Sequence, residues 1–244
     1  MPENATAPPQ AAEPPAIPHD STPTAELPGL KLYLKAESTR LQRWHRDGGG
    51  GLEVSLGRSQ MIDSLLRALF DWSLTSYKPT GGTHRLKVSL VAIGGYGRAE
   101  LNPHSDIDIM LLHNGSVPTL TRIYSHPLLQ QLTGPSGLIY TLYDLGMKVG
   151  HSVRNIQDAV NIANDDMQTK TSLIESRLIT GDTTLFRQFQ QRLEARCVRN
   201  HVDAYLQMRI ADQDARRVKF GNSALLQEPN IKNGCGGLRD YQNL

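Results

Sequence analysis

The sequence lacks the features that mark membrane, secreted and nucleic-acid-binding proteins. Only two of its 244 residues are cysteines, Cys197 and Cys235, too few for a disulfide framework or a zinc site. No apolar run approaches the roughly 20 residues that a transmembrane helix needs. The amino terminus has no basic region followed by an apolar one, so no signal peptide is predicted. The net charge of +2 is too small to indicate a nucleic-acid or acidic membrane partner. These absences fit a protein of the reducing cytoplasm.

The chain is long enough for one large domain or two small ones, and its hydrophobic content of 39% is adequate for a core. Residues 1–28 are rich in proline, alanine, threonine and glutamate, and they carry too little apolar surface to order themselves. We therefore predict a disordered tail there. A helix is predicted from Leu30 to His45. A second helix, starting near Ser59, has apolar residues at helical spacing and should pack on a sheet.

The stretch from residue 88 to residue 112 organises the rest of the chain. It opens with an apolar, β-branched run, Val88 to Ile93, and a glycine turn follows at Gly94 and Gly95. A polar loop then leads to a second apolar run, Ile107 to Leu112. This order predicts a strand, a glycine turn, a short helix and a second strand.

Two aspartates alternate with apolar residues at the start of the second predicted strand. Because side chains two apart in a strand point the same way, Asp106 and Asp108 should share one face while Ile107 enters the core. Two carboxylates on one face repel each other unless a cation lies between them. Hard cations such as Mg²⁺ accept carboxylate oxygens and keep positions for substrate phosphates. Asp106 and Asp108 are therefore predicted metal ligands.

The glycine turn and the residues after it could supply a phosphate site. Gly94 and Gly95 have no Cβ to block a close approach, so main-chain N–H groups can reach a phosphate. Arg98 adds a fixed charge with bidentate geometry, and Ser105 could add a hydroxyl. An SDID tetrapeptide alone is weak evidence for a metal site, and a Gly-Gly turn after a strand usually has no role beyond reversing the chain. The two together, with an arginine between them, are far more specific.

A third strand is predicted within residues 138–149, after the end of a helix. In that strand Asp144 and Lys148 would lie on one face. A two-metal site needs a third carboxylate on a neighbouring strand, and Asp144 would supply it. Lys148 would face a phosphate or simply solvent. The chain from Ile156 to about Phe220 is predicted to be helical throughout, with breaks near Asn164, Gly181 and Asn200.

The central stretch, with letters GGYGRAELNPHSDIDIMLL, resembles the nucleotidyltransferase signature of the superfamily that includes DNA polymerase β. Within it, the chain resembles the bifunctional PII uridylyltransferase/uridylyl-removing enzymes. The segments TSLIESRLITGD and EPNIKNGCGGLRD resemble the same family, so the resemblance runs from about Arg58 to the end. The chain departs from the family pattern at Ala99, often glycine there, and near Cys235, where proline is common.

The resemblance implies an α+β fold, a polymerase β-like nucleotidyltransferase with a small mixed sheet, flanking helices and a C-terminal helical segment. We divide the chain into the tail (1–28), a catalytic domain (29–154) and an incomplete helical domain (155–244). In the family's pattern the third acid of the site maps to Asp144. The enzymes of this family continue into hydrolase and sensor domains, so uridylyl removal and glutamine sensing are not expected of this chain.

The activity implied by the resemblance is transfer of UMP from UTP to a tyrosine of the PII nitrogen-regulatory protein. Two Mg²⁺ ions would be held by Asp106, Asp108 and Asp144, with Gly94, Gly95 and Arg98 around the phosphates. Nothing in the residues themselves selects uracil. Three alternatives stay open: another nucleotide or acceptor, a module that binds nucleotide without turnover, and an inactive fragment whose substrate pocket needs a missing part.

Overall fold

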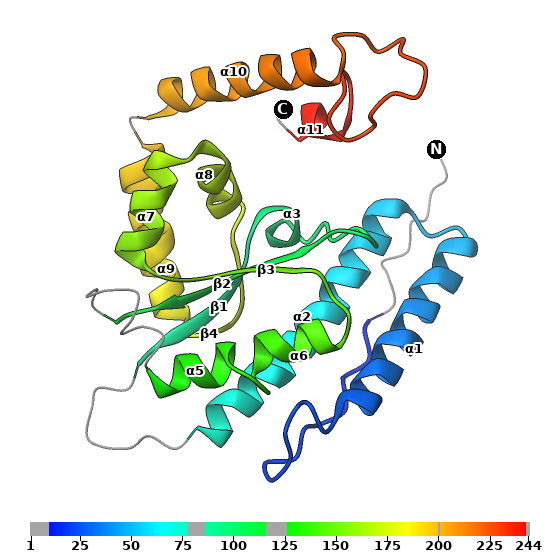
Figure 1. Ribbon diagram of the computed structural model, residues 1–244, viewed down its shortest axis with the longest axis vertical. Coiled ribbons are helices and arrows are strands. Elements are labelled where there is room, and N and C mark those ends of the chain that lie inside the picture. Colours follow the sequence, from blue (N-terminus) through cyan, green and yellow to red (C-terminus); the bar gives the residue numbers. More distant parts are fainter. Residues whose placement is uncertain (1–9, 78–85, 116–125, 200, 243–244) are drawn as a thin grey trace.

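The computed structural model describes residues 10–77, 86–115, 126–199 and 201–242, and it has an α+β architecture (Figure 1). Its sheet has the strand order β3-β2-β1-β4 and lies between two layers of helices. The strands are β1 (Val88–Ala92), β2 (Ile107–His113), β3 (Val149–Asn155) and β4 (Arg177–Gly181). β2 is parallel to β3, whereas β1 is antiparallel to both β2 and β4. The predicted α+β fold with a small mixed sheet is therefore confirmed.

One face of the sheet is covered by helices from the first half of the chain. These are α1 (Leu27–Arg46), α2 (Gly51–Ser76), α5 (Pro127–Thr133) and α6 (Leu138–Asp144). Of these, α2 and α6 contact the strands and α1 packs on the outer side of α2 (Figure 1). The predicted apolar face of α2 is fully buried at Ile62, Leu65 and Leu69. It meets Ile107 and Ile109 of β2, which belong to the same core cluster. The inward direction predicted for the isoleucines of β2 is thus confirmed.

The opposite face packs against later helices. These are α7 (Ile156–Asp165), α8 (Met167–Ile174), α9 (Thr183–Leu193) and the π-helix η1 (Glu194–Val198). Met110 and Leu112 of β2 enter this second core, together with Phe189 of α9. Asp108 precedes them by two and four residues, so it lies on the same face of the strand. The carboxylate of Asp108 therefore lies at the edge of this second core.

The chain then leaves the sheet and folds back over it. Helix α10 (Val202–Phe220) is followed by a loop that returns beneath it to α11 (Leu238–Tyr241) (Figure 1). None of the helices in the described ranges is both long and apolar enough to cross a membrane.

Two of the predicted boundaries are wrong. Helix α2 begins at Gly51 rather than near Ser59, and Gly50, in an extended conformation, is its N-cap. The segment expected to be helical throughout contains β4, which pairs with β1. The breaks near Asn164 and Gly181 are confirmed by the end of α7 and the start of α9. The break at Asn200 lies outside the described residues.

The predicted tail includes residues that contact the helices. Residues 1–9 lie outside the described part of the chain. Ala11 and Ile17 pack against the first core, and Tyr33 of α1 donates a hydrogen bond to the carbonyl of Ala12 at 3.1 Å. The indole of Trp72 donates to the carbonyl of Ser21 at 3.2 Å. The disorder of residues 1–28 and the division into domains stay predictions.

Candidate active site

The glycine turn forms the short helix α3 (Gly94–Gly97) directly beside the carboxylates. The N–H of Ile93, just before the turn, donates to the carbonyl of Asp108 at 3.0 Å. Gly94 has a φ of 58°, which favours glycine. A Cβ on Gly97 would collide with the main-chain oxygen of Glu175. The turn can therefore lie this close to the end of α8 only because residue 97 has no side chain.

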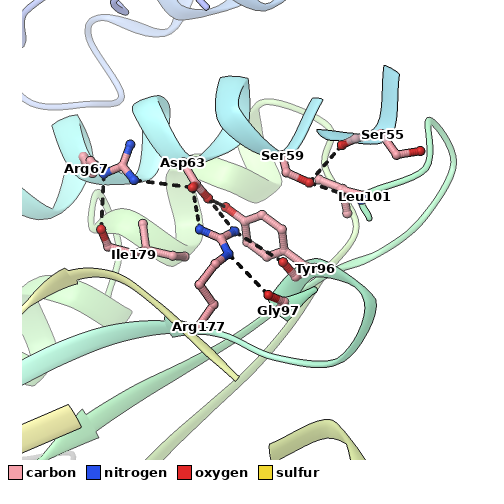
Figure 2. Close-up of polar contacts among 9 residues, drawn as sticks. All are labelled: Ser55, Ser59, Asp63, Arg67, Tyr96, Gly97, Leu101, Arg177 and Ile179. Atoms are coloured by element: carbon pink, nitrogen blue, oxygen red, sulfur yellow. Dashed lines mark hydrogen bonds and ion pairs between the residues drawn. The ribbon is translucent and has the colours of Figure 1, made fainter. Parts of the chain in front are cut away.

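A buried polar cluster holds the turn in place (Figure 2). Asp63 of α2 accepts a hydrogen bond from the Tyr96 hydroxyl at 2.6 Å and from Arg177 Nη1 of β4 at 2.6 Å. Arg177 also donates to the carbonyls of Tyr96 and Gly97, both at 3.3 Å. Asp63 and Tyr96 are only 5% and 1% exposed. The Asp63 carboxylate thus joins α2, α3 and β4. The sequence analysis did not identify Asp63, Tyr96 or Arg177 as members of such a cluster.

The polar loop after the turn is also tied to α2. Ser59 Oγ accepts from the N–H of Leu101 at 3.2 Å and donates to the carbonyl of Ser55 at 2.9 Å (Figure 2). Ser55 Oγ donates to Asn102 Oδ1 at 3.0 Å. These bonds fix the chain just before it reaches Asp106.

Asp106 is exposed and Asp108 is half-buried, and both line a cavity of about 920 Å³. Burial of Asp108, together with the charge of Asp106, raises the pKa of the Asp108 carboxyl, while the charge of Lys232 acts in the opposite direction. In the parallel pairing of β2 and β3, Asp108 lies opposite Gly150. A Cβ at Gly150 would collide with Asp108 Oδ1. The neighbouring strand therefore leaves room for this carboxylate.

The cavity brings together most of the predicted site residues. Gly95, Arg98, Ser105, Asp106 and Asp108 all line it. Gly94 adjoins them in the chain. The Arg98 guanidinium forms ion pairs with Glu100 at 2.8 Å and Glu175 at 2.6 Å, so its charge is largely compensated.

Asp144 and Lys148 do not line this cavity. The strand predicted to carry them begins later, at Val149, and Asp144 is the exposed last residue of α6. The prediction of its strand position is wrong because a helix occupies residues 138–144. Lys148 is exposed, and its carbonyl accepts from the N–H of Ile107 at 2.8 Å. Its predicted phosphate contact and the metal-ligand role of Asp144 stay predictions.

The donor set at the cavity suits a cation that takes other ligands from its substrate. In the described ranges, no group of three or more histidine, cysteine, aspartate or glutamate side chains gathers to hold a metal. The pair Asp106 and Asp108 supplies carboxylate oxygens alone. Mg²⁺ is usually bound by one or two carboxylates together with substrate phosphates and water. The pair therefore fits a Mg²⁺ site that a phosphate ligand completes.

The close approach of β3 to Asp108 gives a testable prediction. Changing Gly150→Ala should push the Asp108 carboxylate aside and weaken Mg²⁺-dependent nucleotide binding about tenfold or more, an effect typical of residues that orient metal ligands. Calorimetric titration of nucleotide with and without Mg²⁺ measures this. The control is Ser152→Ala on the same face of β3, whose buried hydroxyl has no partner among the described residues. Equal binding by Gly150→Ala and the wild type would contradict the role given to this glycine.

Two known proteins with sequences similar to this chain share one name. A family model described as GlnD PII-uridylyltransferase matches residues 204–244. A bifunctional uridylyltransferase/uridylyl-removing enzyme of Erythrobacter litoralis is 34% identical over 195 residues, covering 80% of this chain and 20% of that protein. The enzyme of the same name from Rhodospirillum rubrum is 33% identical over 221 residues, covering 90% of this chain and 22% of that protein.

The chain spans about one fifth of the length of each of these relatives. The aligned parts are nevertheless long enough to include the sheet, the glycine turn and the carboxylate pair within one continuous similarity. A short motif shared by chance would not extend over 80% or 90% of the chain. Together these findings show that the chain belongs to the family of the bifunctional uridylyltransferase/uridylyl-removing enzymes.

Proposed function

We propose that the chain is a metal-dependent nucleotidyltransferase that transfers UMP from UTP to a tyrosine of the PII nitrogen-regulatory protein. The observation that carries this proposal is the position of Asp106 and Asp108. Their carboxylates form no hydrogen bond or ion pair with any described residue, and they lie beside a glycine turn in a large cavity. Nucleoside triphosphate and PII protein as partners are supported by the names of the family model and the relatives.

The chain's own residues would bind and orient the reactants. The turn at Gly94 and Gly95 lets main-chain N–H groups approach the phosphates, and Ser105 offers a hydroxyl at the rim. The two aspartates would hold Mg²⁺, which when bound polarises phosphoryl oxygens and lowers the pKa of the attacking hydroxyl. Arg98 lines the cavity, where its ion pairs with Glu100 and Glu175 support the shape of the site.

In the proposed reaction the tyrosine oxygen forms a bond to the α-phosphorus of UTP. The bond from that phosphorus to the bridging oxygen breaks, and pyrophosphate leaves with the electron pair. The hydroxyl proton passes to solvent, which reaches the site because Asp106 is exposed. Positioning of these groups supplies most of the rate acceleration in reactions of this kind.

The free state of Cys197 and Cys235 supports a reducing cytoplasm as the compartment.

A second candidate function is transfer from another nucleotide or to another acceptor. Nothing in the residues themselves selects uracil, which keeps this candidate open.

The test is transfer of label from α-labelled UTP to purified PII protein in the presence of Mg²⁺. We expect labelled PII with Mg²⁺ and none with chelator. A panel of ATP, CTP and GTP measures nucleotide preference in the same assay. Absence of labelling with Mg²⁺, while Mg²⁺-dependent UTP binding persists, would contradict PII as the acceptor for this chain.

A further inference from the structure

The loop after α10 and the start of α11 each present one cation at the cavity, Lys232 and Arg239. The N–H of Arg239 donates to the carbonyl of Lys232 at 3.0 Å, and the N–H of Leu238 donates to Ile231 at 2.9 Å. These bonds place Lys232 and Arg239 side by side, although seven positions separate them. Both side chains are exposed and both line the same cavity as Asp106 and Asp108. We call residues 230–240 the glycine loop.

The glycine loop is anchored to α10 by a buried ion-pair cluster. Asp240 accepts from Arg216 at 3.3 Å, and Arg216 also pairs with Asp212 at 3.1 Å. The Arg216 side chain is only 8% exposed. The N–H of Gly236 donates to Asp240 Oδ2 at 3.0 Å, which closes the loop on itself. A defined structure therefore holds the two cations beside the cavity.

The charges around the cavity divide into compensated and uncompensated groups. Arg98 is paired with Glu100 and Glu175, and Arg216 is paired with acidic residues of its own segment. In contrast, the side chains of Lys232 and Arg239 form no ion pair or hydrogen bond with any residue in the described ranges. The charge of Lys232 is nevertheless close enough to act on Asp108.

Strand β3 adds another cation to the cavity lining. Arg154 lines the cavity, and its buried Nη1 has no hydrogen-bond partner in the described part of the chain. A buried guanidinium N–H needs a hydrogen-bond partner, and a phosphate oxygen in the cavity would supply one. The cavity lining thus combines the carboxylates of Asp106 and Asp108 with the cations Lys232, Arg239 and Arg154, and the charges of Asp158 and Asp166 act on Arg154.

We propose that Lys232 and Arg239 of the glycine loop bind the triphosphate of the nucleotide in the cavity that they share with the carboxylate pair. A triphosphate carries several negative charges, of which a metal on Asp106 and Asp108 offsets only part. Lys232 and Arg239 offset the rest. This proposal rests on the proposed function for the presence of a nucleotide, and it adds binding residues to that site from the segment matched by the family model.

The test compares the binding of UTP and UMP to Lys232→Ala and Arg239→Ala in the presence of Mg²⁺. The hydrogen bonds that build the loop use the main chains of both residues, so alanine leaves them in place. We expect each variant to bind UTP about tenfold more weakly, the loss typical of one charge-assisted contact. UMP binding should stay within about twofold, and Lys232→Arg should recover most of the UTP affinity.

The control is Lys219→Ala, which removes an exposed lysine of α10 that does not line the cavity. UTP affinity unchanged in both loop variants would overturn the proposal, as would an equal loss for UTP and UMP. A wild-type chain that binds UTP no better than UMP would also overturn it. Failure of label transfer to PII by a wild type that binds UTP tightly would instead contradict only the proposed acceptor.

Discussion

Asp108→Asn is expected to lower the rate of label transfer from UTP by about 1,000-fold or more, because it removes a charge on which the metal site depends. Loss of a direct ligand should exceed the 10- to 100-fold effect typical of residues that only orient ligands. Asparagine has nearly the shape of aspartate, so it fits beside Gly150 as the native residue does. The measurement is initial rate of transfer at saturating Mg²⁺, together with thermal unfolding.

The fold should survive this change. The Asp108 side chain makes no hydrogen bond with any residue in the described ranges, and its structural role passes through its carbonyl, which accepts from Ile93. Asp214→Asn, an exposed carboxylate of α10 away from the cavity, is the matched control. If Asp108→Asn transferred label at a rate within tenfold of the wild type, the assignment of Asp106 and Asp108 as the metal ligands would be contradicted.

The same assay on Asp144→Asn decides the role of the predicted third ligand. A loss as large as that of Asp108→Asn would support Asp144 as a ligand and would require α6 to move toward the cavity. A rate within threefold of the wild type would exclude it.

Asp63→Ala should destabilise the fold by about 3 kcal/mol, because removal of one partner from a buried ion pair leaves the other uncompensated. Asp63 receives hydrogen bonds from Tyr96 at 2.6 Å and from Arg177 at 2.6 and 3.1 Å. For a chain of this size the expected loss lowers Tm by roughly 6 to 12 °C. Thermal and urea unfolding measure it.

Arg67→Ala is the comparison that gives this prediction its specificity. Arg67 also pairs with Asp63, but at 3.4 Å and with a side chain that is 46% exposed. An exposed pair of this kind contributes about 1 kcal/mol or less. If Arg67→Ala and Asp63→Ala destabilised the fold equally, the Asp63–Arg177 ion pair could not be the main source of the stabilisation.

Local patterns in the sequence were sufficient to predict the parts of the fold that depend on neighbouring residues. The strands at Val88 and Ile107, the glycine turn and the alternation at Asp106 and Asp108 all follow from period-two spacing and from glycine. The capping of α7 by Asn155 was also predictable, and its side chain accepts from the N–H of Asp158 at 2.8 Å.

The remaining features depend on residues far apart in the chain. β4 lies in a segment with helical spacing, and it becomes a strand because β1 offers it an edge. The Asp63 cluster joins residues separated by up to 114 positions, so no local pattern could indicate it. Asp144 was placed one element too late because the helix α6 extends to it, and Gly146, with a φ of 79°, makes the turn before β3 begins at Val149.

The contribution of β4 to the sheet has a consequence for synthesis on the ribosome. β1 and β2 emerge early, but β1 has an unpaired edge until residues 177–181 leave the exit tunnel. An unpaired edge next to a buried, apolar strand promotes association between nascent chains. Arg177 arrives in the same segment and completes the Asp63 cluster. Nascent chains stalled before residue 177 should therefore need chaperone protection, whereas chains released after residue 181 should not.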